Sequence, residues 1–228
     1  LHIHGGGFCL GSSDGQDTDL EKLSNEMNCS VISVDYRLAP EYAYPAAADD
    51  CETVALWLIE NLKIEYGTEK IVIGGESAGA HLCVTTLLRL KNKNVHHKVK
   101  ALNLIFGTYN ANTLPSEINA ENENLLLSSK MMKKFEDSYL QNKEDKTNPD
   151  VSPMFGNFSD MPPAIFTIGT RDLLLDHTLL MHSRWIAYGN KAELVIVPGA
   201  DHAFIAFPCE TTSAVIKELN RFILNEIS

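Results

Sequence analysis

Short apolar runs rich in β-branched residues alternate along this chain with longer segments whose apolar residues recur at helical spacing. The short runs predict strands at Leu1–His4, Val31–Tyr36, Lys70–Gly74, Val99–Phe106, Ala164–Gly169 and Leu194–Val197. The longer segments predict helices at Thr18–Asn28, Ala46–Tyr66, Ala78–Leu90, Leu173–Tyr188 and Thr212–Glu226. This alternation is typical of an α/β domain, in which helices cover both faces of a mostly parallel sheet.

The alternation is interrupted once, over residues 108–162. This stretch has no strand pattern, is rich in Asn, Glu and Ser, and contains one helix-like piece near Ser128–Leu140. The apolar side chains that could dock it on the domain are Leu125, Leu126, Leu127, Met131, Met132, Phe135 and Tyr139. Insertions of this length are usually functional, so we expect a cap or lid over a binding site, within a single domain of residues 1–228.

Composition narrows the classes of partner. The net charge of −11 disfavours nucleic acid, because binding to phosphates needs a basic face. No apolar run reaches the roughly 20 residues that a membrane-spanning helix requires. The five cysteines are scattered, with no C-x-x-C pair and no zinc-type spacing, so we expect reduced thiols packed as small apolar residues in a cytoplasmic protein.

The first residue is Leu1 rather than methionine, and the chain enters its first predicted strand at once. No lead-in, signal peptide or cap precedes a segment that reads as a central strand. We therefore expect the natural N-terminus to be missing from this sequence, together with any targeting segment.

The segment Gly75-Glu76-Ser77-Ala78-Gly79 fits the pattern G-x-S-x-G. It follows the apolar run Ile71-Val72-Ile73 and opens a predicted helix, which is the strand–turn–helix setting of a nucleophile elbow. The glycines relieve clashes at the sharp turn, where the serine backbone is strained. The amides at the helix N-terminus face developing negative charge. This context favours Ser77 as a nucleophile over an ordinary glycine-bounded turn.

The segment His4-Gly5-Gly6-Gly7 directly follows the first predicted strand. Successive glycines leave bare N–H groups that can approach an oxyanion closely, as in the oxyanion loop of lipases and esterases. A phosphate-binding loop would need the lysine of G-x-x-x-x-G-K-[ST], which Gly11-Ser12-Ser13 does not supply. We expect His4 to anchor this loop by hydrogen bonding and to take no part in proton transfer.

A serine hydroxyl needs a general base, and the base needs a third group that fixes its tautomer. His202 and Asp172 each lie just past a predicted strand, where an open α/β sheet places its site. Asp176, four residues later, is the alternative acid, and Asp172 could equally be a plain helix N-cap. Five other histidines fall on predicted helices or in a polar loop and not just past a strand, so we expect them to be ordinary surface or core residues: His81, His96, His97, His177 and His182.

These motifs resemble those of the hormone-sensitive-lipase-like family of α/β-hydrolases, whose bacterial members are often called family IV esterases. Three further segments carry the likeness: Asp35–Glu41 with Tyr44–Ala47, Asn148–Met154, and Met161–Ala164. The resemblance covers nearly the whole chain, and its motifs come in the family's order.

The resemblance implies an α/β-hydrolase fold with a cap, no cofactor, and hydrolysis of short- to medium-chain acyl esters through an acyl-enzyme. The triad that it implies is Ser77, Asp172 and His202, and the implied oxyanion-hole amides are those of Gly5, Gly6 and Ala78. Arg37 and Glu41 would be structural and would hold the bend after the second predicted strand.

Two features depart from the family pattern. Glu76 stands where the family usually has Asp, which adds one methylene beside the nucleophile. Family members also carry two further strands and part of the cap before the oxyanion motif, and this sequence holds no such residues.

A fold does not fix a function, so the same scaffold can serve other classes of protein. A non-catalytic small-molecule receptor on this scaffold is disfavoured, because plant hormone receptors resembling the family have lost the histidine that stands here at position 202. Amide hydrolysis or deacetylation by the same acyl-enzyme chemistry stays open, because the sequence does not position the cap residues that shape the pockets. Neither the natural ester nor the oligomeric state is predicted.

Overall fold

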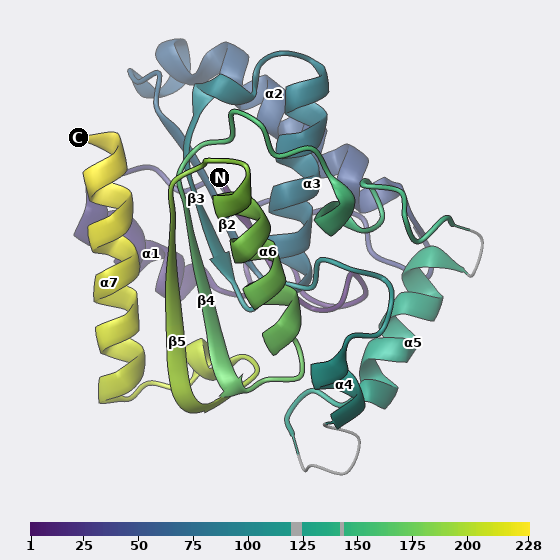
Figure 1. The fold of residues 1–228 in the computed structure, drawn as a ribbon. Helices are drawn as coiled ribbons and strands as arrows, with labels where there is room; N and C mark the ends of the chain where they lie inside the picture. Colours follow the sequence, from purple (N-terminus) through teal and green to yellow (C-terminus); the bar gives the residue numbers. More distant parts are fainter. Residues whose placement is uncertain (120–124, 142–143) are drawn as a thin grey trace.

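The computed structural model describes residues 1–119, 125–141 and 144–228 (Figure 1). At its centre is a five-stranded, entirely parallel sheet in which the strand order follows the chain, β1-β2-β3-β4-β5. The strands are β1 (His2–Ile3), β2 (Ile71–Glu76), β3 (Val99–Ile105), β4 (Ala164–Arg171) and β5 (Ala192–Asp201).

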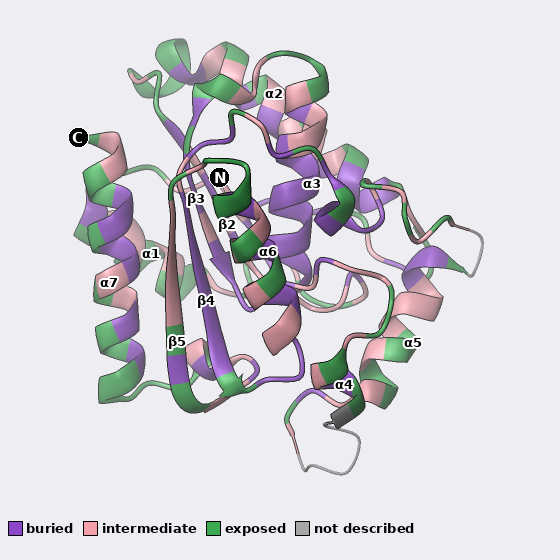
Figure 2. Cartoon of the chain, in the orientation of Figure 1, coloured by how far each residue is buried: buried purple, intermediate pink, exposed green. Residues whose placement is uncertain are grey.

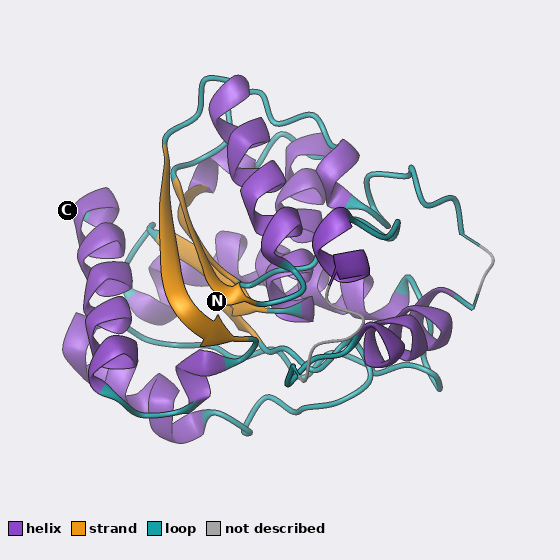
Figure 3. Ribbon diagram, turned by 60° about the horizontal axis from the view of Figure 1, so that its bottom comes forward, coloured by secondary structure: helices purple, strands orange, loops and turns teal. Residues whose placement is uncertain are grey.

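Helices cover both faces of this sheet. In the described residues they are α1 (Asp17–Met27), α2 (Ala46–Tyr66), α3 (Ala78–Asn92), α4 (Pro115–Asn119), α5 (Ser129–Leu140), α6 (Leu175–Ala187) and α7 (Glu210–Ile227). The helices α2, α3 and α6 pack on one face, and α1 and α7 pack on the other (Figures 1 and 3). The arrangement confirms the predicted α/β fold.

The strands are apolar on both sides because each side meets a helical layer. In β3, Leu102 and Leu104 pack with α2, α3 and α6, whereas Ala101 and Ile105 pack with α1 and α7. Figure 2 shows β4 buried along most of its length between these layers. Burial on both faces explains why the strands read as continuous apolar runs with no alternation of polar residues.

The strand predicted at Val31–Tyr36 is wrong, because only Ser33 forms a bridge, with His2. The His2 N–H donates to the Ile32 carbonyl at 2.8 Å, and the Val34 N–H donates to the His2 carbonyl at 3.1 Å. The segment therefore runs beside β1 but finds little backbone to pair with, since β1 itself is only two residues long.

Residues 108–162 contain α4, α5 and a 3-10 turn at Pro153–Phe155, and their described parts contain no strand. The α5 helix matches the helix-like piece predicted near Ser128–Leu140, whereas the short α4 was not predicted. The parts of the predicted cap at 120–124 and 142–143 lie outside the described residues.

Two further sequence expectations concern membrane-spanning helices and the cysteine thiols. No helix in the described part of the chain is long and apolar enough to cross a membrane. All five cysteines are free: Cys51 and Cys83 are buried and Cys9 is half-buried, but Cys29 and Cys209 are exposed. The expectation of apolar packing is therefore wrong for the last two.

Candidate active site

Ser77 lies at the turn between β2 and α3, in a strained backbone conformation. Its φ of 55° and ψ of −119° belong to a region that residues with a side chain rarely adopt. A Cβ atom at Gly75 would lie 2.3 Å from the Ile3 carbonyl oxygen, and one at Gly79 would lie 1.9 Å from it. Only glycine fits at positions 75 and 79, because β1 passes directly against the turn.

A hydrogen-bonded relay joins Ser77 to two residues far along the chain. The Ser77 Oγ lies 3.0 Å from the Nε2 of His202, and the Nδ1 of His202 lies 2.7 Å from the Oδ2 of Asp172. The Asp172 carboxylate is completely shielded from solvent. Because this carboxylate can only accept, Nδ1 carries the imidazole proton and the Nε2 lone pair faces the serine hydroxyl.

The register of two strands brings the acid and the histidine together. Arg171, the last residue of β4, pairs with Asp201, the last residue of β5. The next residues along each strand, Asp172 and His202, therefore emerge side by side at the carboxyl edge of the sheet, where open parallel sheets place their sites.

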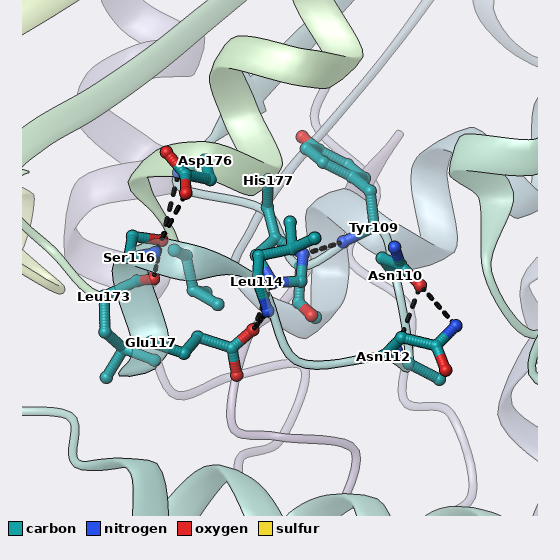
Figure 4. Close-up of polar contacts among 12 residues, drawn as sticks. Tyr109, Asn110, Asn112, Leu114, Ser116, Glu117, Leu173, Asp176 and His177 are labelled. Atoms are coloured by element: carbon teal, nitrogen blue, oxygen red, sulfur yellow. Dashed lines mark hydrogen bonds and ion pairs between the residues drawn. The ribbon is translucent and has the colours of Figure 1, made fainter. Parts of the chain in front are cut away.

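Asp176, the alternative acid, has different partners (Figure 4). Its Oδ2 accepts the N–H of Ser116 at 2.9 Å, and the Ser116 hydroxyl donates to the Leu173 carbonyl at 2.7 Å. Asp172 meanwhile accepts the N–H of Leu174 on its Oδ1, at 2.9 Å. This bond closes a turn just before α6 and does not cap the helix, whose N-cap residue is Leu174 and which has no side-chain cap, so the N-cap alternative for Asp172 is wrong.

Two buried histidines outside the relay brace the start of the insertion. The Nδ1 of His81 donates to the Thr108 carbonyl at 2.9 Å, and burial lowers the pKa of His81 to about 4. The Nδ1 of His177 accepts the N–H of Tyr109 at 3.0 Å, and its Nε2 donates to the Glu117 carboxylate at 3.0 Å (Figure 4). Both side chains hold the chain that leaves β3.

The loop that follows β1 is anchored from two sides. The Tyr36 hydroxyl donates to the His4 carbonyl at 2.8 Å, and the two rings stack with their centroids 4.2 Å apart. The Nδ1 of His4 donates to the Gly5 carbonyl at 2.8 Å, and burial lowers the pKa of His4. These contacts confirm the anchoring role predicted for His4.

The amide of Gly5 is not free, contrary to the expectation that it would face an oxyanion. Its single N–H donates to the Oε1 of Glu76 at 2.8 Å. Gly6 and Gly7, with φ of 112° and 60°, donate their N–H groups to no other group in the described residues. Ala78 begins α3, where the first amides have no partner within the helix. The amides without a partner are therefore those of Gly6, Gly7 and Ala78, and Gly7 was not in the predicted set.

A cavity of about 410 Å³ opens over Ser77. The larger apolar residues of the insertion that line it are Leu127, Met132, Phe135, Tyr139, Leu140 and Val151. The Phe135 ring lies against the oxyanion loop, since a Cβ at Gly7 would be 2.4 Å from its Cγ. Leu126 and Met131, which were also expected to dock, are instead 52% and 42% exposed.

This chain is similar to known proteins along most of its length. A family model described as alpha/beta hydrolase fold matches residues 1–206. Acetyl esterases of Salmonella paratyphi A and Salmonella dublin are 30% identical to this chain over 210 residues. That alignment covers 90% of this chain, which spans 65% of the length of each of these relatives.

Solved structures are similar as well. An esterase of Pyrobaculum calidifontis superposes with a TM-score of 0.91 at 30% identity, covering 96% of this chain and 73% of that chain. A thermostable carboxylesterase cloned from a metagenomic library gives a TM-score of 0.87 at 28% identity, with coverages of 96% and 75%. A hormone-sensitive lipase from a metagenome library gives 0.90 at 27% identity, with coverages of 99% and 77%.

Proposed function

This chain belongs to the α/β-hydrolase fold family, and we propose that it hydrolyses small carboxylic esters with Ser77 as the nucleophile. The observation that carries the proposal is the continuous relay from Asp172 through His202 to Ser77, with separations of 2.7 and 3.0 Å. A hydroxyl at the end of such a relay can lose its proton as it attacks a carbonyl carbon.

Acylation uses the relay and the free amides together. The Ser77 Oγ attacks the ester carbonyl while the Nε2 of His202 takes its proton, and the carbonyl oxygen becomes an oxyanion. The N–H groups of Gly6, Gly7 and Ala78 donate to that oxygen, which stabilises the tetrahedral intermediate. The intermediate then collapses: the bond to the alcohol oxygen breaks, and the Nε2 proton passes to the leaving alcohol.

Deacylation repeats the sequence with water. His202 removes a proton from a water molecule, which attacks the acyl carbon on Ser77, and the same amides hold the second oxyanion. The Ser77 oxygen leaves and recovers its proton from the imidazole, so a carboxylic acid is released. The buried Asp172 carboxylate stabilises the imidazolium that forms in both halves of the reaction.

Esters with short to medium acyl chains suit the cavity. Its walls are mostly apolar, and the insertion roofs it with Leu127, Met132 and Phe135. Each acyl methylene that the cavity buries gains about 0.8 kcal/mol, whereas methylenes beyond its reach gain nothing or clash with the roof. The names of similar proteins, among them acetyl esterases, support an ester rather than an amide as the preferred substrate.

A series of p-nitrophenyl esters from acetate to laurate tests this function, with Ser77→Ala as the inactive control. We expect kcat/KM to peak between about two and six acyl carbons and then to fall, because the roof limits the apolar area that can be buried. A curve that still rises at twelve carbons would contradict the proposed substrate class. A Ser77→Ala variant that keeps its activity would contradict the proposed chemistry.

A further inference from the structure

Glu76, the residue before the nucleophile, makes contacts that the acyl-enzyme chemistry does not use. Its Oε1 accepts the N–H of Gly5 at 2.8 Å, and its Oε2 lies 3.1 Å from the Nε2 of His2. Because a carboxylate can only accept, the His2 Nε2 carries a proton and donates it. The other ring nitrogen of His2 lies 3.1 Å from the Ser33 hydroxyl. A chain of hydrogen bonds thus runs from Ser33 to the oxyanion loop.

This chain of bonds is largely shielded from solvent. The side chains of His2 and Glu76 are only 12% and 13% exposed. Water therefore competes little for these groups, and their hydrogen bonds hold a defined geometry better than those of an exposed pair.

The first glycine of the loop also touches the nucleophile turn. A Cβ at Gly5 would lie 2.9 Å from the Glu76 carbonyl oxygen and 3.3 Å from the Cβ of Ser77. The Gly5 peptide is thus the place where the loop and the turn meet, and the Glu76 carboxylate is the side-chain group that bonds them there.

The glycines that supply free amides have few restraints of their own. On the side that leads away from β1, the Gly6 carbonyl accepts the N–H groups of Cys9 and Leu10, at 3.1 and 2.9 Å. On the side of β1, the Gly5 carbonyl accepts from the His4 Nδ1 and the Tyr36 hydroxyl, at 2.8 and 3.3 Å. The hydrogen bond that ties Gly5 to the nucleophile turn is the one from its N–H to Glu76. Glycine is the most flexible residue, and a misplacement of about 0.5 Å is enough to weaken a catalytic hydrogen bond.

We propose that Glu76 is a positioning residue for ester hydrolysis, whose carboxylate fixes the oxyanion loop to the nucleophile turn while His2 fixes that carboxylate. The inference rests on the proposed function and deepens it. The Glu76 side chain acts through the backbone of Gly5 and does not touch the ester. Its effect is to hold the Gly6 and Gly7 amides where the oxyanion forms.

The decisive comparison is between Glu76→Met and Glu76→Gln in the full chain. Met keeps the length of the side chain but accepts no hydrogen bond from Gly5. Gln keeps an acceptor for Gly5, and its NH₂ group can donate to His2 once the imidazole proton moves to the nitrogen that faces Ser33. We expect Met to lower kcat for p-nitrophenyl butyrate by roughly 10- to 100-fold, less than the roughly 10²- to 10³-fold loss when a whole oxyanion donor is removed, and Gln to stay within about threefold of wild type.

Each preparation is titrated with a fluorophosphonate, so that kcat refers only to folded active sites. KM should change by less than about threefold, because the lost interaction belongs to the transition state. Glu65→Met, an exposed carboxylate on α2, is the matched control and should leave kcat unchanged. A merely structural role for Glu76 would reduce the titratable fraction and leave the kcat of the remaining sites at the wild-type value, which would overturn the proposal.

His2 provides a second test that does not depend on Glu76→Met folding well. His2→Ala should lower kcat in the same direction, by roughly three- to tenfold, because it frees the carboxylate rather than removing it. In the Glu76→Met background it should have no further effect, since the two residues act through one hydrogen bond. Independent, multiplying effects on kcat would overturn the role assigned to His2.

Different results would reject the proposed function and the positioning role of Glu76. Activity that survives Ser77→Ala would reject the proposed function itself. An inactive Ser77→Ala together with wild-type kcat in Glu76→Met would leave the function standing and reject the positioning role.

Discussion

Arg171 at the end of β4 is the register partner of Asp201 at the end of β5, and the two side chains form an ion pair of 2.9 Å. Both side chains are substantially exposed, so the pair itself contributes little to stability. The register that it marks is what matters for the site, because it places Asp172 next to His202. A shift of one residue between the strands would move one of these residues by about 3.3 Å along the strand direction relative to the other.

The first prediction distinguishes the two carboxylates of this region. Asp172→Asn should lower kcat by about 10⁴, because the imidazole of His202 would be held in the wrong tautomer. Asp176→Asn should stay within about tenfold of wild type, since an amide oxygen can still accept the Ser116 N–H. Steady-state ester hydrolysis measures both, and a larger loss in Asp176→Asn would show that the acid has been assigned wrongly.

The second prediction concerns the roof of the cavity. Phe135→Ala removes the ring that lies against Gly7, so the preferred acyl chain should lengthen by about two to four carbons. Each newly buried methylene raises kcat/KM by roughly fourfold, which corresponds to about 0.8 kcal/mol. Met131→Ala is the control on the same helix, because Met131 is 42% exposed and does not line the cavity. An unchanged ester profile in Phe135→Ala, or an equal shift in Met131→Ala, would rule out this roof.

The third prediction follows from the buried His81, whose pKa falls from 6.5 to about 4 on folding because burial disfavours its charged form. Between these pH values the unfolded chain binds the proton and the folded chain does not. The free energy of unfolding therefore decreases as the pH falls from 6.5 to 4, by about 3 kcal/mol from this group.

Urea unfolding at several pH values checks this expectation. His81→Asn removes the titrating group while its amide can still donate to the Thr108 carbonyl, so it should flatten the pH dependence over that window. His97→Asn, at an exposed position, should retain the wild-type slope. If His81→Asn also keeps the wild-type slope, the buried His81 is not the source of the pH dependence of the free energy of unfolding.

The fourth prediction tests the contact between the insertion and α6. His177→Leu leaves the buried Tyr109 N–H without its acceptor and takes a donor from Glu117, so the free energy of unfolding should fall by about 1–3 kcal/mol. Ile118→Ala, an exposed change on the same short helix α4, should stay within about 0.5 kcal/mol of wild type. Equal stabilities of the two variants would mean that the contact does not hold the insertion.

Apart from Val31–Tyr36, the strands of the sheet could be predicted from strong local patterns, and so could the meeting of Ser77, Asp172 and His202. The runs that became β2 and β4 are mostly apolar, and the glycines around Ser77 mark a turn that other residues cannot form. The relay then required only that Asp172 and His202 follow strands, since parallel strands end at one edge of a sheet.

The errors arose where structure depends on a distant partner. Val31–Tyr36 has the residues of a strand, but the two-residue β1 beside it cannot support a full ladder. The Gly5 amide, which was expected to be free, is instead bonded to the Glu76 carboxylate, 71 residues away in the chain. The sequence also did not predict which face of α5 covers the cavity. Met131 and Met132 are both apolar and adjacent in the sequence, yet of the two only Met132 lines the cavity.

The most direct test of the account is the site of covalent labelling by a fluorophosphonate. The reagent should form one adduct, on the peptide that carries Ser77, and hydrolysis of p-nitrophenyl butyrate should be lost in proportion to labelling. Ser77→Ala should take up no label while it keeps the fold, and its activity should drop by roughly 10⁶, as for other triad nucleophiles. An adduct on any other residue, or ester hydrolysis that persists in Ser77→Ala, would contradict the claim that Ser77 is the nucleophile.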